Sequence, residues 1–262
     1  MNMLRPRIIP CLLVKDKGLV KTINFKNPKY VGDPINAVRI FNEKEVDELI
    51  VLDIDATREN RGPDYKMIEH LAEECRMPFC YGGGVKTVEA AQRIIGLGVE
   101  KVAISSAAVE NPELVTEAAG CVGNQSVVVV LDVKKRATGG KYEVWIRNGQ
   151  KNTGKCPLEL AQKMEKLGAG EVVVNSIDND GMMKGYDLHL IGKIRKAISV
   201  PLTVLGGAGS LRDINQLISN FGVIGAAAGS LFVFKGVYRA VLINYPNRAE
   251  KETIIREFSR VH

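Results

Sequence analysis

The sequence is poor in histidine, the residue that most often performs acid–base and metal chemistry near neutral pH. Its 262 residues include three: His70, His189 and His262. The first two fall in polar helical contexts and the third ends the chain, so we expect all three at the surface. Histidine triads and histidine-rich metal sites are therefore poor candidates. Acid–base chemistry would rest on carboxylates, and no metal or cofactor is expected.

Paired cysteines and long apolar runs are also missing. The five cysteines form no CxxC pair, which argues against a disulfide framework or a zinc site and favours reduced thiols. The apolar stretch at 8–14 is broken by Pro10 and is too short for a signal peptide or a membrane span. These absences predict a soluble, cytoplasmic protein with no membrane partner.

The charge balance is basic, with 36 Lys and Arg against 30 Asp and Glu and a net charge of +6. No run of basic residues is interleaved with aromatics, so a nucleic-acid partner is not expected. Two interpretations stay open at this point. The charge is a general surface property, or part of it faces an anionic ligand such as a phosphate ester.

Short β-rich apolar runs alternate with amphipathic helical segments along the whole chain. Helical patterns such as Val88–Leu97 carry apolar residues at i, i+3, i+4 and i+7. Eight buried strands joined by crossover helices specify a parallel sheet, and eight strands can close into a (β/α)8 TIM barrel of the α/β class. A doubly wound open sheet is the alternative. The expected strands are Arg7–Leu13, Glu48–Ile54, Pro78–Tyr81, Lys101–Ser105, Ser126–Asp132, Glu171–Ser176, Pro201–Leu205 and Val223–Ala228.

A repeat favours the barrel. The segment PFCYGGGVKTVEAAQRII from Pro78 is answered by PLTVLGGAGSLRDINQLI from Pro201, and ELIVLDIDA from Glu48 by EVVVNSIDN from Glu171. Motifs in the same order at a nearly constant offset indicate a duplicated half-barrel. No Pro/Ser-rich linker separates the halves, so residues 1–262 are expected to form a single domain. Two long basic loops, at about 15–33 and 134–155, suit a lid over an anionic substrate, and the second contains a hairpin-like KYEVWIRNG.

Glycine-rich turns follow the expected strands in both halves. Glycines let the backbone approach an anion, and N–H groups at a helix start point toward it. Two such pairs facing one another suit a small molecule phosphorylated at both ends. The candidate phosphate-binding residues are Gly82, Gly83, Gly84, Ser105, Ser106, Asp180, Gly181, Gly206, Gly207, Gly229 and Ser230.

Carboxylates also end several strands. Asp132 closes the fifth strand in an apolar run and is the expected catalytic acid, since carboxylates at barrel strand ends are often catalytic. Asp55 and Asp180 could instead cap the helices that follow. The repeat aligns Asp132 with Leu13, and leucine cannot transfer a proton. At the opposite face, Arg7, Glu48, Lys101 and Glu171 begin four strands and could form a structural ring of alternating charge.

Together these motifs resemble the cyclase subunit of imidazole glycerol phosphate synthase, the ammonia-using half of a glutamine amidotransferase complex in histidine biosynthesis. The matching stretches run in order from Arg7 to Phe232 and include RIIPCL, DELIVLDI, GGGV, LDVKK, GAGEVVVNSIDNDG, GGAGS and AAAGSLF. The resemblance implies that a glutaminase subunit docks on the barrel bottom. It also implies that Arg7, Glu48, Lys101 and Glu171 form a gate for ammonia, with Asp132 as a catalytic acid.

Departures from the family pattern point to a diverged paralogue. Leu13 occupies the position of a second catalytic aspartate, while Met182, Leu205 and Ser105 replace polar family residues. Because Met182 and Leu205 lie in the second half, we expect its glycine turns to bind anions less tightly than those of the first half. The closest resemblance is to paralogues of sugar amidation in surface-polysaccharide biosynthesis.

Three functions are therefore weighed. The first is ammonia delivery to a separate amidotransferase that modifies a nucleotide sugar or glycan precursor. The second is the cyclase reaction of histidine biosynthesis, with Asp132 acting without a second acid. The third is a non-catalytic activator that binds a phosphorylated metabolite and switches on its glutaminase.

Overall fold

The computed structural model describes residues 5–137, 139–236 and 238–261, with side chains described up to residue 255. Eight parallel strands close into a barrel in the order β1, β4, β5, β6, β7, β10, β11 and β12. β12 pairs with β1, and β7 pairs with β10. This closure confirms the predicted (β/α)8 barrel and excludes the open sheet. The barrel strands are β1 (Arg7–Lys15), β4 (Leu49–Asp53), β5 (Phe79–Gly82), β6 (Lys101–Ile104), β7 (Val127–Lys135), β10 (Glu171–Ser176), β11 (Leu202–Leu205) and β12 (Gly225–Ala228).

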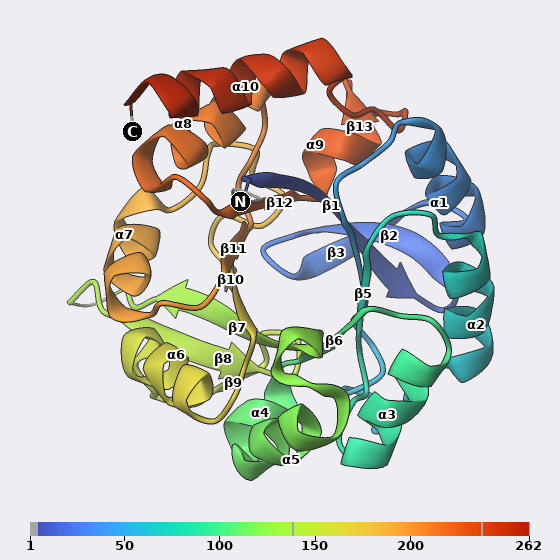
Figure 1. Cartoon of the computed structure of the whole chain (residues 1–262), viewed down its shortest axis with the longest axis vertical. Helices are drawn as coiled ribbons and strands as arrows, with labels where there is room; N and C mark the ends of the chain where they lie inside the picture. Colours follow the sequence, from blue (N-terminus) through green and yellow to red (C-terminus); the bar gives the residue numbers. More distant parts are fainter. Residues whose placement is uncertain (1–4, 138, 237, 262) are drawn as a thin grey trace.

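Helices form an outer ring around these strands, as Figure 1 shows in a view down the barrel. Their apolar faces pack on the outward-facing strand residues in one continuous core. The helices are α1 (Pro34–Glu43), α2 (Tyr65–Glu74), α3 (Val88–Gly96), α4 (Ser106–Glu110), α5 (Glu113–Val122), α6 (Pro157–Lys166), α7 (Leu188–Ala197), α8 (Leu211–Phe221), α9 (Ser230–Val233) and α10 (Arg248–Val261), with a short 3₁₀ turn at Asn124–Ser126.

Side-chain caps fix the starts of the longer helices. The Asp64 carboxylate accepts a hydrogen bond from the Met67 backbone at α2, and Asp187 accepts one from Leu190 at α7. Asp55 and Asp180, considered as caps from the sequence, do not perform this role. Asp55 instead pairs with Lys15 at 2.9 Å.

Both long loops after strands are hairpins that extend the barrel sheet. β8 (Tyr142–Ile146) pairs antiparallel with β7 and with β9 (Lys151–Asn152), which places the predicted hairpin. The first loop also folds, into β2 (Gly18–Ile23) and β3 (Lys26–Gly32), which the sequence analysis treated as a loop. A further small hairpin, β13 (Phe234–Lys235) with β14 (Ala240–Val241), follows α9. The two halves thus each carry a hairpin after their first strand, as a duplication predicts.

The interior of the barrel is filled by the inward-facing residues of every strand. Because successive side chains of a strand point to opposite faces, each strand contributes every second residue to this interior. On β1 the inward column is Arg7, Ile9, Cys11 and Leu13. The middle of the interior is apolar, and polar groups stand at its two ends.

Candidate functional site

The carboxyl ends of the barrel strands surround one cavity. Strands of a parallel barrel all end at the same face, so the residues that follow them converge there. Every residue predicted to bind phosphate lines this cavity, together with Asp132 and Leu13. The predicted residues in its wall are Leu13, Gly82, Gly83, Gly84, Ser105, Ser106, Asp132, Asp180, Gly181, Gly206, Gly207, Gly229 and Ser230. What these residues bind is not fixed by their position and stays a prediction.

Asp132 projects into the cavity from β7. Its Oδ1 accepts a hydrogen bond of 3.0 Å from the Asn175 side chain on β10, the neighbouring strand. Burial raises the pKa of Asp132 to about 7, although the hydrogen bonds from Asn175 and Ser105 oppose the shift. A carboxyl group with this pKa can both hold and release a proton near neutral pH.

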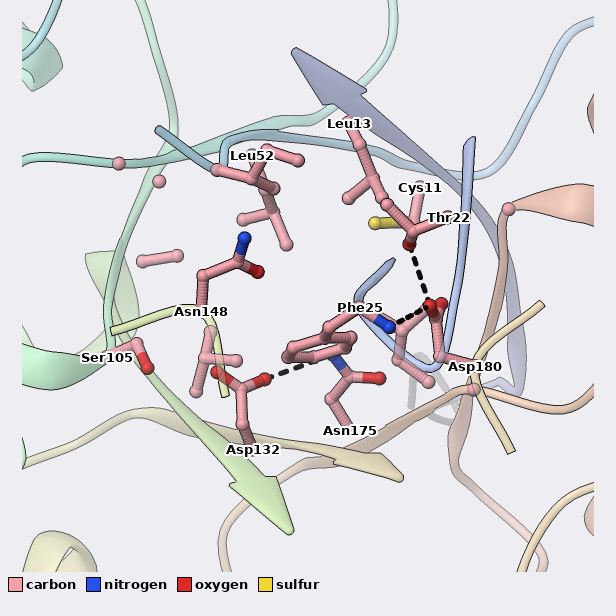
Figure 2. Close-up of a pocket in the computed structure, with 18 of the residues that line it drawn as sticks. Cys11, Leu13, Thr22, Phe25, Leu52, Ser105, Asp132, Asn148, Asn175 and Asp180 are labelled. Carbon is pink, nitrogen blue, oxygen red and sulfur yellow. Dashed lines mark hydrogen bonds between the residues drawn. The ribbon is translucent and has the colours of Figure 1, made fainter. Parts of the chain in front are cut away.

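Apolar side chains face Asp132 across the cavity. Figure 2 shows Leu13 and Leu52 on the opposite side from the Asp132 carboxylate. Leu205 also lines the cavity, whereas Met182 is not among the described residues of its wall. The position where the family resemblance implies a second acid therefore holds a hydrocarbon surface. A proton shuttle between two facing carboxylates at positions 13 and 132 is excluded in this chain.

Glycine is required in the cavity wall by close contacts. Gly83 has a φ of +129°, and a Cβ there would lie 2.6 Å from the Asp53 carbonyl oxygen. A Cβ at Gly229 would lie 2.5 Å from the Lys21 ammonium nitrogen. A side chain at Gly83 would collide with the backbone of the wall, whereas one at Gly229 would have to displace the end of the Lys21 side chain.

Lys21 is a site residue that the sequence analysis missed. It lies on β2, is only 5% exposed, and donates a 2.6 Å hydrogen bond to the Cys11 carbonyl. Burial lowers the pKa of Lys21, while Cys11 and Asp180 raise it. The ammonium lies beside Gly229, at the second-half glycine turn. Lys21 adds a donor that favours anion binding at the second-half turn, whereas Met182 and Leu205 favour the first-half turn, so which turn binds anions more tightly stays a prediction.

Asp180 holds the β2–β3 hairpin over the cavity. Its Oδ2 accepts hydrogen bonds from the Thr22 hydroxyl at 2.7 Å and from the Phe25 backbone at 3.1 Å. Figure 2 shows both bonds, with the Phe25 ring standing in the cavity near Asp132 and Asn175. Burial raises the pKa of Asp180, and its hydrogen bonds oppose that shift. Asp180 is thus a structural anchor for the hairpin as well as a wall residue.

Asn175 was also missed, although a sequence signal for it existed. Glu171, Val173 and Asn175 alternate along β10, so Asn175 must face inward if Glu171 does. It is 5% exposed, and its Oδ1 has no hydrogen-bond partner among the described residues. An acceptor left open toward a cavity suits a ligand with an N–H or O–H group.

One group of described acidic side chains is close enough to share a cation: Asp16, Asp55 and Glu59. The Lys15 ammonium already lies 2.9 Å from both Asp16 and Asp55. A lysine therefore supplies positive charge to this cluster, and the arrangement gives no reason to assign a metal.

The charged residues at the other end of the barrel form a closed ring. Arg7 pairs with Glu48 and, at 2.7 Å, with Glu171. The Lys101 ammonium lies 2.8 Å from a carboxylate oxygen of each of the same two glutamates. Glu48 directly precedes β4, and the other three residues begin their strands. Both glutamates are almost fully buried.

The ring is electrostatically tight. Burial alone would raise the pKa of Glu171, but Arg7 and Lys101 lower it to about 2. The carboxylates of Glu171 and Glu48 in turn hold the pKa of Arg7 above its ordinary value, against burial. Thr203 adds a 2.5 Å hydrogen bond to Glu171. Glu100 precedes Lys101 in the sequence, and its carboxylate accepts a 2.7 Å hydrogen bond from the Phe79 backbone N–H.

A packed cluster of apolar side chains lies between the ring and the cavity. It comprises Ile9, Cys11, Ile50, Cys80, Ala103, Val128, Val130, Val173, Leu205 and Ala227. Burial raises the pKa of the Cys11 and Cys80 thiols, so both stay neutral. Ions are excluded from such a region by the cost of desolvation, whereas a small neutral molecule is not.

Comparison with known proteins assigns the family. The model of the histidine biosynthesis protein family matches residues 7–239. The chain belongs to this family. It is 59% identical over 252 residues to a Leptospira interrogans protein provisionally named imidazole glycerol phosphate synthase subunit HisF, covering 96% of the chain and 99% of that relative.

Two further relatives of this family member differ in how firmly they are named. A Pseudomonas aeruginosa protein, provisionally named subunit hisF2, is 54% identical over 94% of the chain and 97% of its own length. The imidazole glycerol phosphate synthase subunit HisF of Streptococcus sanguinis is 42% identical over 88% of the chain and 91% of its own length. Among the described helices, none combines the length and apolarity that crossing a membrane requires.

Proposed function

We propose that the chain is the ammonia-accepting barrel subunit of a glutamine-dependent synthase complex, and that a glutaminase subunit docks on the ring end of the barrel. The observation that carries the proposal is the closed ring of Arg7, Glu48, Lys101 and Glu171 at the base of an apolar interior. The printed names of the relatives, which are synthase subunits, support it.

The ring and the interior suit transfer of a neutral nitrogen donor. Ammonia is small and uncharged, so it can cross the apolar residues, while ammonium would lose its hydration there. The ring excludes bulk ions and closes the barrel base. Passage requires at least one of the four ion pairs to part, and Lys101 is the more flexible cation of the two.

The cavity is the proposed end of the passage. Its glycine turns and the Lys21 ammonium suit a phosphorylated small molecule. Asp132 would hold or release one proton beside that ligand, and Asn175 would position the Asp132 carboxyl.

Two fates of the ammonia are supported by different observations. The names of the relatives favour cyclisation to imidazole glycerol phosphate more directly than the sugar amidation expected from the sequence. Leu13 in the cavity wall favours delivery to a separate acceptor, because the facing acid is missing. Leu13 thus supports delivery to a separate acceptor, for which we propose a nucleotide sugar or glycan precursor, and the names of the relatives support cyclisation as the second candidate.

Binding of the glutaminase is tested by co-purification and by the rate of glutamine hydrolysis with and without the barrel. We expect a complex at micromolar concentrations and a clear stimulation. A barrel carrying Arg39→Met, which breaks an exposed ion pair on α1, is the control. It should leave complex formation and the stimulation of glutamine hydrolysis unchanged. No complex at micromolar concentrations would contradict ammonia acceptance.

The fate of the ammonia is tested separately with ammonium salt and the bis-phosphorylated ribulosyl aminoimidazole substrate. The wild-type chain should form the imidazole product at least about 100-fold more slowly than an ordinary cyclase, since one of two acid–base groups is missing. Leu13→Asp should form the product faster than the wild type and Leu13→Asn should not, because only the acid can move a proton. Ordinary turnover by the wild type would favour cyclisation.

A further inference from the structure

Exposed apolar side chains gather on two hairpins beside the cavity. Seven large apolar residues are exposed in the described part of the chain, and five of them belong to the β2–β3 and β13–β14 hairpins and their flanks. Tyr238 is 97% exposed, Tyr30 66% and Leu242 51%. The five are Ile23, Tyr30, Tyr238, Val241 and Leu242, which we call the mouth patch.

The two hairpins are neighbours at the cavity mouth. The Lys29 ammonium of β3 lies 5.7 Å from the ring centre of Phe234 on β13. Arg239, in the turn before β14, donates a 3.4 Å hydrogen bond to the carbonyl of Gly181, which lines the cavity. The Asn24 backbone in the β2–β3 turn donates to the Asp180 carbonyl at 2.9 Å. Both hairpins are therefore fixed to the same wall segment of the cavity.

The charged residues of the two hairpins themselves have one sign. Residues 18–32 and 234–242 contain five Lys and Arg residues and no Asp or Glu. Among the basic residues, Lys26, Lys29 and Lys235 are exposed. An apolar centre with a basic rim is complementary to a surface with an apolar centre and an acidic rim.

Part of the mouth patch lies outside what the family model describes. The match ends at residue 239, before Val241 and Leu242. Val241 and Leu242 thus lie beyond the matched residues, at the end of the barrel where the ammonia would leave.

We propose that the mouth patch is the docking surface for the enzyme that receives the ammonia, a protein with an apolar centre and an acidic rim. This inference rests on the proposed delivery of ammonia to a separate acceptor. Ammonia that leaves an open mouth is protonated and diluted by water, so a passage that serves a second enzyme must be covered at its exit. The exposed aromatic and aliphatic side chains at that exit supply the apolar centre of an interface with such a partner.

The test measures binding of a purified sugar amidotransferase from the same organism to the complex of the chain with its glutaminase. We expect Kd to rise at least 10-fold when Tyr238→Glu and Leu242→Glu are combined, since the added carboxylates would be buried against the apolar centre of the partner. Lys235→Glu should weaken binding about threefold or more. Ile40→Glu is the matched control, because Ile40 is an exposed apolar residue on α1, away from both hairpins, and should leave Kd unchanged.

Two further measurements separate the possible occupants and the two proposals. Stimulation of the glutaminase by the Tyr238→Glu, Leu242→Glu variant should stay at the wild-type level, which shows that the fold and the ring end are intact. Unchanged amidotransferase binding by that variant, with stimulation retained, would overturn the docking surface while ammonia acceptance stands. The chain could instead dimerise, or bind vesicles of anionic lipid, in a way that the same substitutions abolish. Either result would overturn the proposed docking surface in favour of a second copy of the chain or of a membrane.

Discussion

Asp132 combines a cavity position with an unusual proton affinity. Its pKa of about 7 lies above the 3.8 of an ordinary aspartate. The folded chain therefore binds a proton that the unfolded chain releases between about pH 4 and pH 7, and it loses stability as the pH rises through that window. Above pH 7 the full cost of a buried carboxylate is present.

Asp132→Asn should remove this pH dependence. We expect the variant to gain stability relative to the wild type as the pH rises from 4.5 to 8, by on the order of 2 kcal/mol. Urea unfolding at both pH values measures the difference. Glu117→Gln on the exposed face of α5 is the control and should show no such trend. A difference that stays constant with pH would argue against the raised pKa.

The stability that the ring residue Glu171 contributes should change with pH in the opposite direction. Glu171 has a folded pKa of about 2 against an ordinary 4.5, so its contribution is complete above pH 4.5 and is lost as the pH falls toward 2. Arg7→Met leaves the buried Glu171 with one partner fewer, which should cost about 3–5 kcal/mol at pH 7. Denaturant unfolding of both proteins tests this. Arg39→Met, in an exposed pair with Glu74, should cost no more than about 1 kcal/mol; equal losses would contradict a buried ring.

Single residues of the site were predictable where a motif or the repeat marked them. The glycine turns, Asp132 and the four ring residues all carried such marks. Lys21 carried no such mark, and Asn175 was marked only by the alternation of residues along its strand. Lys21 enters the cavity only because residues 18–32 fold back as a hairpin, and the sequence alone predicted a loop there.

Among the elements, the turns after the barrel strands make the clearest prediction. Gly83→Ala forces a side chain into a φ of +129° and against the Asp53 carbonyl, and should cost about 2 kcal/mol or more. Gly96→Ala, in α3 with open space around it, should instead stabilise by about 0.5 kcal/mol. Thermal unfolding measures both, and a shift of the same sign in both variants would contradict the assigned contacts.

Gly229→Ala tests the second-half turn as an anion site. The added methyl group displaces the Lys21 ammonium, so affinity for inorganic phosphate should fall at least 10-fold in calorimetry. Gly209→Ala is unsuitable as a control because it meets the Met183 carbonyl, whereas Gly62→Ala has no neighbour within 4 Å. Phosphate binding that survives Gly229→Ala but not Gly83→Ala would show that the first-half turn binds the anion more tightly.

Strands were easier to predict than hairpins for a physical reason. The eight barrel strands are buried on both faces, so their apolar runs are continuous and their ends fall within two or three residues of the prediction. β3, in contrast, is exposed along most of its length and contains Pro28 and Asn27, which disfavour strands in isolation. Its pairing with β2 compensates for a weak local preference.

At the scale of the whole molecule, the duplicated halves place two anion-binding turns around one cavity. A ligand with a phosphate at each end can engage both, so the second contact is intramolecular. Alkanediol bisphosphates of increasing length should bind at least 10-fold more tightly than the monophosphate at one optimal length. Calorimetry across the series tests this, and equal affinities at all lengths would show that the turns act independently.

The barrel itself was predictable because the repeat and the strand count agree. The single-domain organisation stays a prediction. The destination of the proposed ammonia delivery could not be predicted, since it depends on the chemistry of a partner enzyme. Leu13 changes the expected chemistry without any change in the predicted fold.

Arg7 and Leu13 belong to one inward column of β1 and are separated by two hydrophobic residues, Ile9 and Cys11. A substitution at the upper end of such a column is insulated from the lower end by that spacer. Substitutions at the cavity can then change the reaction there, while the ring end keeps the surface on which we propose that the glutaminase docks. A barrel organised in this way could acquire a new reaction through a few substitutions at the cavity rim, without any change in the ring through which we propose that ammonia enters.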